Sequence, residues 1–261
     1  MTAEQFRKQD GSAGDADYGV IGNTYSDYRR PDPRIAQAVW DALGDARTVL
    51  NVGAGAGSYE PTDRDVTAIE PSASMRKQRP TVLSRAIDAV AESLPFPDNS
   101  FDAAMTTFSV HQWGDLTAGL AEIRRVTRGP VVILTCDPHL LDRFWLAKYA
   151  PGVISTERRR YPTMSQLVEG LGGTATVDLV PIPLDCTDGF NEAYYGRPEE
   201  LLVAEARAVC SAWSFVDPTQ AGQYTAALQT ALDSGEWDAA HGALRQEPTF
   251  EGSLVVVRAM P

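Results

Sequence analysis

Three glycines at alternate positions, Gly53, Gly55 and Gly57, follow a short apolar run that ends at Val52. Glycine has no Cβ, so it occurs where a backbone turns sharply or where a ligand approaches it closely. A second apolar run, residues 66–69, ends in Glu70, whose carboxylate can accept hydrogen bonds from both hydroxyls of an adenosine ribose. A glycine turn and a carboxylate at the ends of two adjacent parallel strands predict a site for a nucleotide-like ligand.

The spacing of the glycines excludes two common nucleotide-binding motifs. A dinucleotide fingerprint requires G-x-G-x-x-G, but Ser58 stands at the last position of that pattern. A phosphate-binding P-loop requires Gly-Lys-Ser/Thr after its glycines, and the sequence lacks this triplet. The segment V-L-N-V-G-A-G-A-G at 49–57, taken together with Glu70, resembles the first motif of the class I S-adenosylmethionine (SAM)-dependent methyltransferases, V-L-D-x-G-x-G-x-G.

A second stretch carries the same resemblance. Residues 91–102, A-E-S-L-P-F-P-D-N-S-F-D, are similar to the segment with which these enzymes hold adenine and enter their fourth strand. Val90 stands where many relatives have an acid, so the adenine amino group is expected to meet Glu92 or the backbone. The resemblance implies SAM as cofactor, with S-adenosylhomocysteine (SAH) as its product, and the following binding residues: Tyr25, Arg29, Asn51, Gly53, Ala54, Gly55, Glu70, Pro71, Met75, Ala91, Glu92 and Thr107.

The fold implied by this resemblance is an α/β, Rossmann-like sheet, mostly parallel with an antiparallel last strand, with helices on both faces and a helical lid insertion. Strands are expected at 49–52, 66–70, 82–87, 101–108, 130–135, 176–182 and 253–258. Helices are expected at 35–43, after an N-cap at Ser72, at 116–126 and at 164–171. The predicted organisation is a mobile tail at 1–17, a SAM-binding core at 18–183, an insertion at 184–249 and the final strand at 250–261.

Two departures from the family pattern affect the predicted site. Between Gly57 and Val66 there is room for about one helical turn, so the helix dipole that faces the cofactor carboxylate is weakened. We expect Arg29 or Arg30 to supply the missing positive charge. Asn51 stands where the family prefers an acid. This leaves open a non-methylating SAM enzyme, such as a cyclase or lyase, and a catalytically silent binding subunit.

The strand at 101–108 ends where the departing methyl group is expected. His111 lies just beyond it and is the candidate catalytic base, because imidazole titrates near neutral pH; a purely structural role is the alternative. The insertion is similar in placement to that of trans-aconitate-type methyltransferases, where it roofs a small-molecule pocket. The candidate substrate-binding residues are aromatic: Tyr28, Trp113, Tyr194, Tyr195 and Trp213. For those within the insertion the alternative is that they form its own core, and for Tyr28 that it packs against the edge of the domain.

Composition limits the possible partners of the chain. Over 261 residues the formal net charge is −12, which argues against a broad phosphate-binding surface and hence against nucleic acid as a partner. The sequence has neither an 18-residue apolar run nor a signal-peptide core, so we expect a cytoplasmic protein with no membrane association. Three cysteines without C-x-x-C spacing are expected to be free thiols, and no cluster of metal-ligand type occurs. We expect a monomer or homodimer that acts on a small molecule.

Overall fold

The structure, a computed structural model, describes residues 28–261. The predicted tail at 1–17 and the cofactor candidate Tyr25 lie outside this part of the chain. The described part is built on a six-stranded sheet. In spatial order the strands are β2 (Asp65–Ile69), β1 (Thr48–Val52), β3 (Ala103–Thr107), β4 (Val131–Cys136), β8 (Leu254–Met260) and β5 (Thr174–Leu179).

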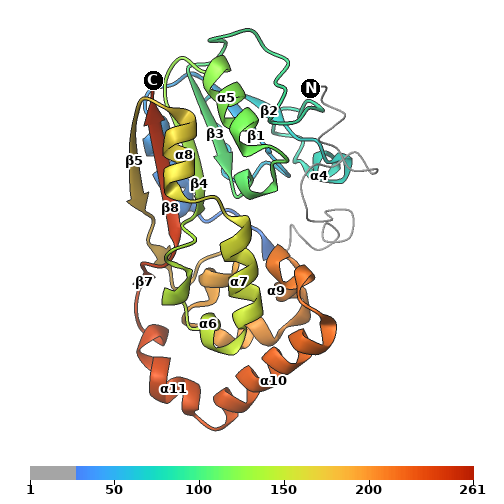
Figure 1. Cartoon of the computed structure of the whole chain (residues 1–261), viewed down its shortest axis with the longest axis vertical. Coiled ribbons are helices and arrows are strands. Elements are labelled where there is room, and N and C mark those ends of the chain that lie inside the picture. The colour runs from blue at the N-terminus through green and yellow to red at the C-terminus, as the bar shows by residue number, and fades with distance from the viewer. Residues whose placement is uncertain (1–27) are drawn as a thin grey trace.

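Strand directions follow the predicted pattern. Strands β2, β1, β3 and β4 are parallel, whereas β8 runs antiparallel to both of its neighbours, β4 and β5 (Figure 1). This confirms a mostly parallel, Rossmann-like sheet whose last strand is antiparallel. The expected strand at 82–87 is wrong, because that segment contributes only one parallel bridge, Ile87 to Ile69. Val82 is 87% exposed, so the segment has no apolar face to bury against the sheet.

Alternation of side chains along the strands gives the sheet two apolar faces. On β4, Val132 and Leu134 join one core cluster, whereas Val131 and Ile133 join the other. The first face is covered by α3 (Pro33–Leu43), which Asp32 caps through its side chain and which ends at Gly44. The second face is covered by α5 (Leu116–Val126) and α8 (Met164–Leu171). Period-two burial in the strands therefore places helices on both faces, as expected.

Helices that follow β4 and helices of the insertion form a second, lower body below the sheet (Figure 1). It contains α6 (Leu146–Tyr149) and α7 (Pro151–Arg160), together with the helices of the insertion. These are η4 (Asn191–Tyr194), η5 (Pro198–Leu202), α9 (Ala204–Ala208), η6 (Ser211–Phe215), α10 (Pro218–Asp233), α11 (Glu236–His241) and η7 (Gly242–Arg245). Helices α6 and α7 pack against α10 and η6, so the helical body also draws on residues before the predicted insertion.

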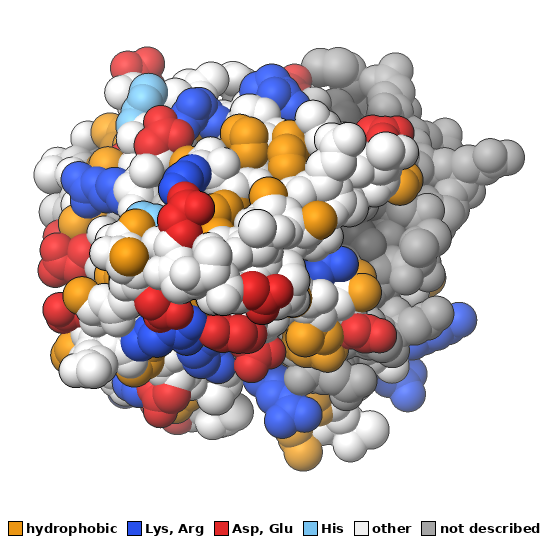
Figure 2. All heavy atoms as spheres, turned by 90° about the horizontal axis from the view of Figure 1, so that it is seen from below, with side chains coloured by type: hydrophobic (Ala, Val, Ile, Leu, Met, Phe, Trp, Pro, Cys, Tyr) orange, Lys and Arg blue, Asp and Glu red, His pale blue; other side chains and the backbone are white. Residues whose placement is uncertain are grey.

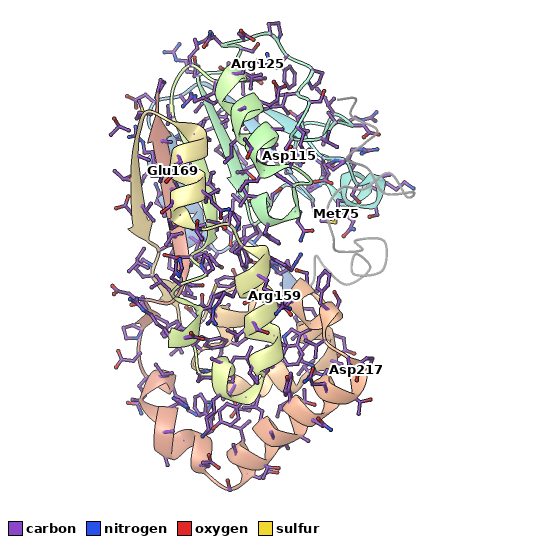
Figure 3. All side chains as sticks on the ribbon, in the orientation of Figure 1. Met75, Asp115, Arg125, Arg159, Glu169 and Asp217 are labelled. Carbon is purple, nitrogen blue, oxygen red and sulfur yellow. The ribbon has the colours of Figure 1, made fainter. Side chains whose placement is uncertain are left out.

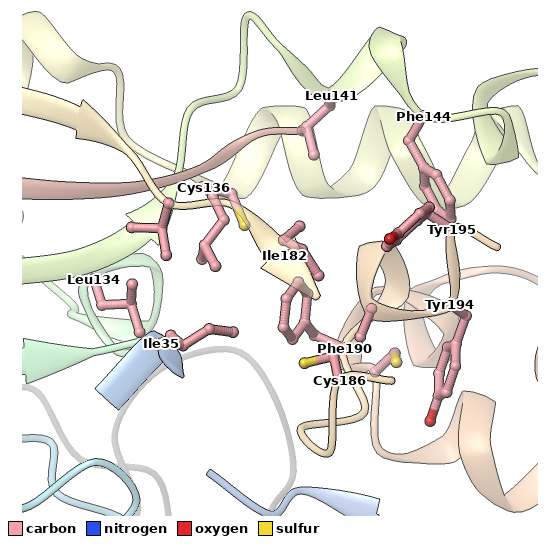
Figure 4. Close-up of a cluster of buried hydrophobic side chains, with 14 of the residues drawn as sticks. Ile35, Leu134, Cys136, Leu141, Phe144, Ile182, Cys186, Phe190, Tyr194 and Tyr195 are labelled. Atoms are coloured by element: carbon pink, nitrogen blue, oxygen red, sulfur yellow. The ribbon is translucent and has the colours of Figure 1, made fainter. Parts of the chain in front are cut away.

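A two-stranded sheet closes the base of the insertion. Strand β6 (Ile182–Pro183) pairs with β7 (Thr249–Phe250), so the two ends of the insertion lie side by side where it joins the core. Within the helical body, Trp145 donates from Nε1 to the carbonyl of Tyr195 at 2.8 Å, and its ring meets that of Trp237 edge-on at 5.5 Å. These side chains belong to the same buried cluster as α3 (Figure 4 shows part of it). The helical body is therefore fixed to the sheet by a shared core.

The surface of the lower body carries both signs of charge. Figure 2, seen from below, shows acidic and basic side chains interspersed over this end of the molecule. Within residues 28–261, no helix is long and apolar enough to cross a membrane, and no group of His, Cys, Asp or Glu side chains is arranged to hold a metal ion. Cys136, Cys186 and Cys210 are buried free thiols, as predicted.

Candidate functional site

A pocket with about 780 Å³ of open space lies at the carboxyl ends of β1, β2 and β3. Such an edge is where ligands bind in open α/β sheets, because loops from adjacent strands diverge there. The pocket is lined by many of the residues predicted to bind the cofactor: Gly53, Ala54, Gly55, Glu70, Pro71, Met75, Ala91, Glu92 and Thr107. Figure 3 shows Met75 on α4 (Ala73–Gln78), beside the strand ends.

Glu70 joins two walls of this pocket. Its Oε2 accepts a hydrogen bond from the backbone N–H of Gly55 at 2.8 Å, and its Oε1 accepts from the N–H of Ser72 at 2.7 Å. Burial raises the pKa of the Glu70 carboxyl, and the two backbone N–H groups act in the opposite direction. Each carboxylate oxygen has more than one acceptor site, so both oxygens can still accept hydrogen bonds from a ligand.

The glycine loop is shaped by its lack of side chains. Gly53 and Gly55 have φ of 69° and 52°, a conformation that strains residues with a Cβ. A Cβ at Gly53 would lie 1.8 Å from Oγ of Ser109, so this glycine lets the loop pack against the end of β3. At Gly55 the nearest atom would be the terminal methyl of Met75 at 3.4 Å. Gly55 therefore leaves open the side of the loop that borders the pocket.

The predicted shortening of the helix after the glycine loop is observed. Residues 58–64 form turns and bends in the described structure, and the next regular element is β2. Asn51 is fully buried and lies beneath the loop, and it is not part of the pocket lining. Its Nδ2 donates to Oε1 of Glu60 at 2.9 Å, and Nη2 of Arg79 donates to the other oxygen at 2.8 Å. Glu60 thus supplies a buried carboxylate close to the position where the family has an acid.

The far wall of the pocket comes from the segment after β3. Trp113, predicted to bind substrate, lines this pocket and donates from Nε1 to Oγ of Ser109 at 3.1 Å. Glu92 accepts from the N–H of Asp115, the N-cap of α5, at 3.0 Å, which orients its carboxylate. The start of α5 at Asp115 is labelled in Figure 3.

A second cavity, with about 410 Å³ of open space, adjoins the first, and Phe108 lines both. The other residues around it come from α7, the 3-10 helix η2 (Val110–Gln112) and the insertion: Arg29, His111, Glu157, Tyr161, Phe190, Asn191, Val209, Cys210 and Ser211. Phe108 has φ of 49°, which is uncommon for a residue with a side chain and is often found at functional sites. His111 faces this second cavity, where its ring lies 4.5 Å from that of Tyr161.

Arg29, predicted to bind the cofactor, lines the second cavity in the described structure. Its guanidinium does not line the first pocket: Nε donates to Oδ1 of Asp188 at 2.5 Å and Nη2 donates to Oδ2 at 3.3 Å. The hydroxyl of Tyr59 also donates to Asp188, at 2.6 Å. Because Asp188 is 2% exposed, charge pairing with this buried acid directs Arg29 toward the insertion. Arg30 is exposed, and its carbonyl accepts from Thr187.

The insertion aromatics predicted to bind substrate mostly lie in its core. Tyr195 is fully buried, its hydroxyl donates to the carbonyl of Glu247 at 2.6 Å, and its ring stacks on Phe250. Tyr194 is also buried, and neither of the two cavities has these tyrosines in its lining; Figure 4 shows both among the core side chains. Tyr28 contributes its carbonyl to the N–H of Gly189. Trp213 stands behind the second cavity and donates to Asn191.

Sequence reasoning missed several residues that line the two cavities. Ser109 and Gln112 line the first pocket and lie within the segment after β3, whose position alone was a usable signal. Glu157 and Asn191 line the second cavity. Glu157 precedes a run of three arginines that predicts a solvated face, and Asn191 lies 34 residues further along the chain. Their proximity depends on tertiary packing and has no local signature.

Known proteins share this domain and this fold. A family model described as a methyltransferase domain matches residues 50–133. The demethylmenaquinone methyltransferase of Renibacterium salmoninarum is 37% identical over 105 residues, which are 36% of this chain and 44% of that protein. The uncharacterized methyltransferase YcgJ of Bacillus subtilis is 31% identical over 37% of this chain and 44% of its own length. The chain therefore matches less than half the length of these two curated relatives.

Solved structures extend the similarity beyond the matched domain. A protein of Anabaena variabilis, described as a candidate methyltransferase from an antibiotic biosynthesis pathway, superposes with a TM-score of 0.81 and 27% identity over 89% of this chain and 98% of that chain. The SAH-bound geranyl diphosphate C-methyltransferase of Streptomyces coelicolor superposes with a TM-score of 0.51 and 14% identity over 99% of this chain and 93% of that chain. The latter similarity concerns the fold alone.

Proposed function

We propose, from its methyltransferase domain at 50–133 and from its fold, that the chain is a class I SAM-dependent methyltransferase that transfers a methyl group from SAM to a small organic acceptor. The observation that carries the proposal is the position of Glu70. Its carboxylate spans the glycine loop and the start of α4 at the edge of the first pocket, with acceptor sites left on both oxygens. Such a carboxylate suits the paired hydroxyls of a ribose.

The rest of the pocket is compatible with the same ligand. Gly55 presents backbone without a Cβ, so a ligand can approach the loop closely. Ile69 and Ala91 offer apolar surface for the adenine ring, and Glu92 lies beside them with an oriented carboxylate. Thr107 and Phe108 lie at the end of β3, toward the second cavity. We therefore assign the nucleoside end of SAM to the Glu70 side, with the methyl-bearing end toward Phe108.

Bound SAM supplies an electrophilic methyl group on a sulfonium, so the chemical demand on the protein is modest. The protein must hold the acceptor in line with the methyl group and exclude water, effects that can contribute several kcal/mol. The helical body, with its core fixed to the sheet, is suited to cover the acceptor. A base is required only where the acceptor atom carries a proton at working pH.

Incubation of the purified chain with methyl-labelled SAM and a fractionated metabolite extract tests this function. Labelled product together with SAH is the expected result. Methylthioadenosine would instead indicate cyclisation or lysis, and tight SAH binding without turnover on any fraction would indicate a binding protein. Calorimetric titration with SAH provides the binding measurement independently of the acceptor.

A further inference from the structure

Glu157 is a carboxylate placed at the wall of the second cavity by a chain of hydrogen bonds. Its Oε1 accepts from Nδ2 of Asn191 at 2.8 Å. Oδ1 of Asn191 in turn accepts from Nε1 of Trp213 at 3.0 Å. An indole nitrogen only donates, so it fixes which end of the Asn191 amide faces Glu157. Two residues of the insertion thus hold this carboxylate of α7 as an acceptor.

The surroundings of this carboxylate indicate the shape of a ligand. Aromatic rings of Phe108, Phe190 and Tyr161 line the cavity, with the Phe108 and Phe190 centroids 5.4 Å apart. Rings prefer tilted or stacked neighbours at such distances, so these walls suit a flat ring. The cavity has less open space than the first pocket, about 410 Å³ against about 780 Å³, which favours a ligand smaller than the one assigned there, such as a single-ring molecule.

The charges near the cavity indicate which polar group the ligand carries. Arg29 lines the cavity and lies over the Phe108 ring at 5.1 Å, and Arg160 is close enough to Glu157 to act on its ionisation. Arg29 is paired with Asp188 and Arg160 lies near Glu157, so opposite charges balance around the cavity, which suits a neutral acceptor. A neutral hydroxyl can donate to Glu157 without adding charge.

We propose that the second cavity is the acceptor site, that Glu157 takes the proton of the acceptor, and that the acceptor is a small single-ring phenol. This inference rests on the proposed function, because the second cavity adjoins the pocket assigned to SAM at Phe108, which lines both. Glu157 would then be the catalytic base, a role for which the sequence pattern indicates His111. His111 lines the same cavity and packs on Tyr161, where it can contact the ring of the acceptor.

The proposed step moves one proton and one methyl group. The phenol O–H bond breaks and its proton goes to Glu157, while an oxygen lone pair forms a bond to the methyl carbon. The bond between methyl carbon and sulfur breaks, and its electron pair remains on sulfur, which becomes the neutral thioether of SAH. The products are the aryl methyl ether and SAH, and Glu157 returns its proton to water after release.

The ionisation of Glu157 is suited to this role. Burial raises its pKa to about 7, against the hydrogen bond from Asn191 and the positive charges of Arg160 and Arg29. Other ionisable groups that act on it or line the same cavity are Glu192, Tyr161, Cys210 and His111. A base that is mostly ionised at slightly alkaline pH accepts a proton more readily than an ordinary surface carboxylate.

The test uses the full chain, methyl-labelled SAM and a panel of single-ring phenols, with anisole and cyclohexanol as matched probes. Ligand-observed NMR on the SAH-bound protein should show binding of at least one phenol. Turnover should yield its labelled methyl ether, with kcat/KM rising with pH and levelling above about 7. Glu157→Gln should lower kcat by roughly 10²–10⁴-fold and abolish this pH limb. SAH affinity should be unchanged, because Glu157 does not line the first pocket.

Glu169→Gln, an exposed change on α8, is the matched control and should leave every readout unaltered. Glutamine has the size of glutamate and can still accept a hydrogen bond from Asn191, so Glu157→Gln should fold. Its SAH affinity measures whether it does. Full turnover by this variant, with loss in His111→Ala, would overturn the assignment of the base. Binding of SAH without binding of any phenol would overturn the acceptor class. Failure of the wild type to bind SAH would overturn the proposed function itself, which is a separate result.

Discussion

Asn51 and Glu60 form a buried amide–carboxylate pair beneath the glycine loop, with Nδ2 of Asn51 2.9 Å from Oε1 of Glu60. Arg79 neutralises the same carboxylate at 2.8 Å, and its side chain is 3% exposed. An acid at position 51 would face Glu60 directly. Asn51 therefore stands at the position of the family's acid, and the buried acid of this chain is Glu60, nine residues later.

Asn51→Asp should destabilise the fold, because it places two carboxylates together with one arginine in a buried site. An uncompensated buried charge costs about 3–5 kcal/mol. The double variant Asn51→Asp with Glu60→Gln restores one acid and one amide and should recover most of the loss. Urea unfolding of the wild type, both single variants and the double variant gives the coupling free energy. Additive effects of the two changes would show that the pair is not coupled.

Glu70→Gln should weaken SAH binding by about ten- to a hundred-fold, the equivalent of about 1.5–3 kcal/mol for a hydrogen bond to a charged group. The glutamine has one acceptor oxygen, whereas the N–H groups of Gly55 and Ser72 both require one. The amide nitrogen must then face a donor or turn away, which also loosens the loop. Calorimetric titration with SAH measures the change, with Glu169→Gln as control. Undiminished affinity would place the ribose elsewhere.

Arg29→Met should lower stability more than it lowers SAH affinity. Within residues 28–261, the change leaves the buried Asp188 carboxylate with only the Tyr59 hydroxyl as a side-chain hydrogen-bond partner. Loss of one partner of a buried pair costs about 3–5 kcal/mol. Thermal unfolding and SAH titration of the same samples separate the two effects. A drop in SAH affinity of tenfold or more, with an unchanged melting temperature, would support the earlier expectation that this arginine binds the cofactor carboxylate.

The parts of the fold that the sequence predicts well have local signals. Gly53 to Gly57 and Glu70 mark the ends of β1 and β2, and Ser72 caps α4 as expected, with Oγ 3.4 Å from the N–H of Met75. The helix that ends at Gly44 and the helix 116–126 were predicted within a few residues. In each case, the periodic burial and the capping residue lie within one short segment.

The misplaced parts depend on contacts between distant segments. Val82 and Ile87 have strand-like character, but the sheet gives them no neighbour beyond one bridge, and Val82 stays exposed. Arg29 is a cation that we expect at the cofactor from the sequence, yet its position is determined by its ion pair with Asp188, 159 residues away. Tyr195 carries a hydroxyl suited to a ligand, but packing directs it to Glu247. A single sequence contains no signal for these three pairings.

Stability should fall as pH rises from about 4.5 to about 7, because burial raises the pKa of three carboxyls, those of Glu70, Glu157 and Glu192. Burial raises the pKa of Glu192 to about 7, and that of Glu157 likewise, above the ordinary glutamate value. In this range the folded protein keeps protons that the unfolded chain releases. Unfolding therefore releases protons and becomes more favourable as pH increases. Above about pH 7 both states have lost these protons, so the contribution stays constant.

Glu192→Gln should reduce this slope, since it removes one of the three groups. Glu192 accepts from the N–H and hydroxyl of Ser253, the hydroxyl at 2.6 Å, so part of this network remains available to the glutamine oxygen. Urea unfolding at pH 5, 6, 7 and 8 measures the slope, and Glu169→Gln serves as the control with an exposed carboxyl. A slope in Glu192→Gln equal to that of the wild type would show that Glu192 is ionised in the folded protein throughout this range.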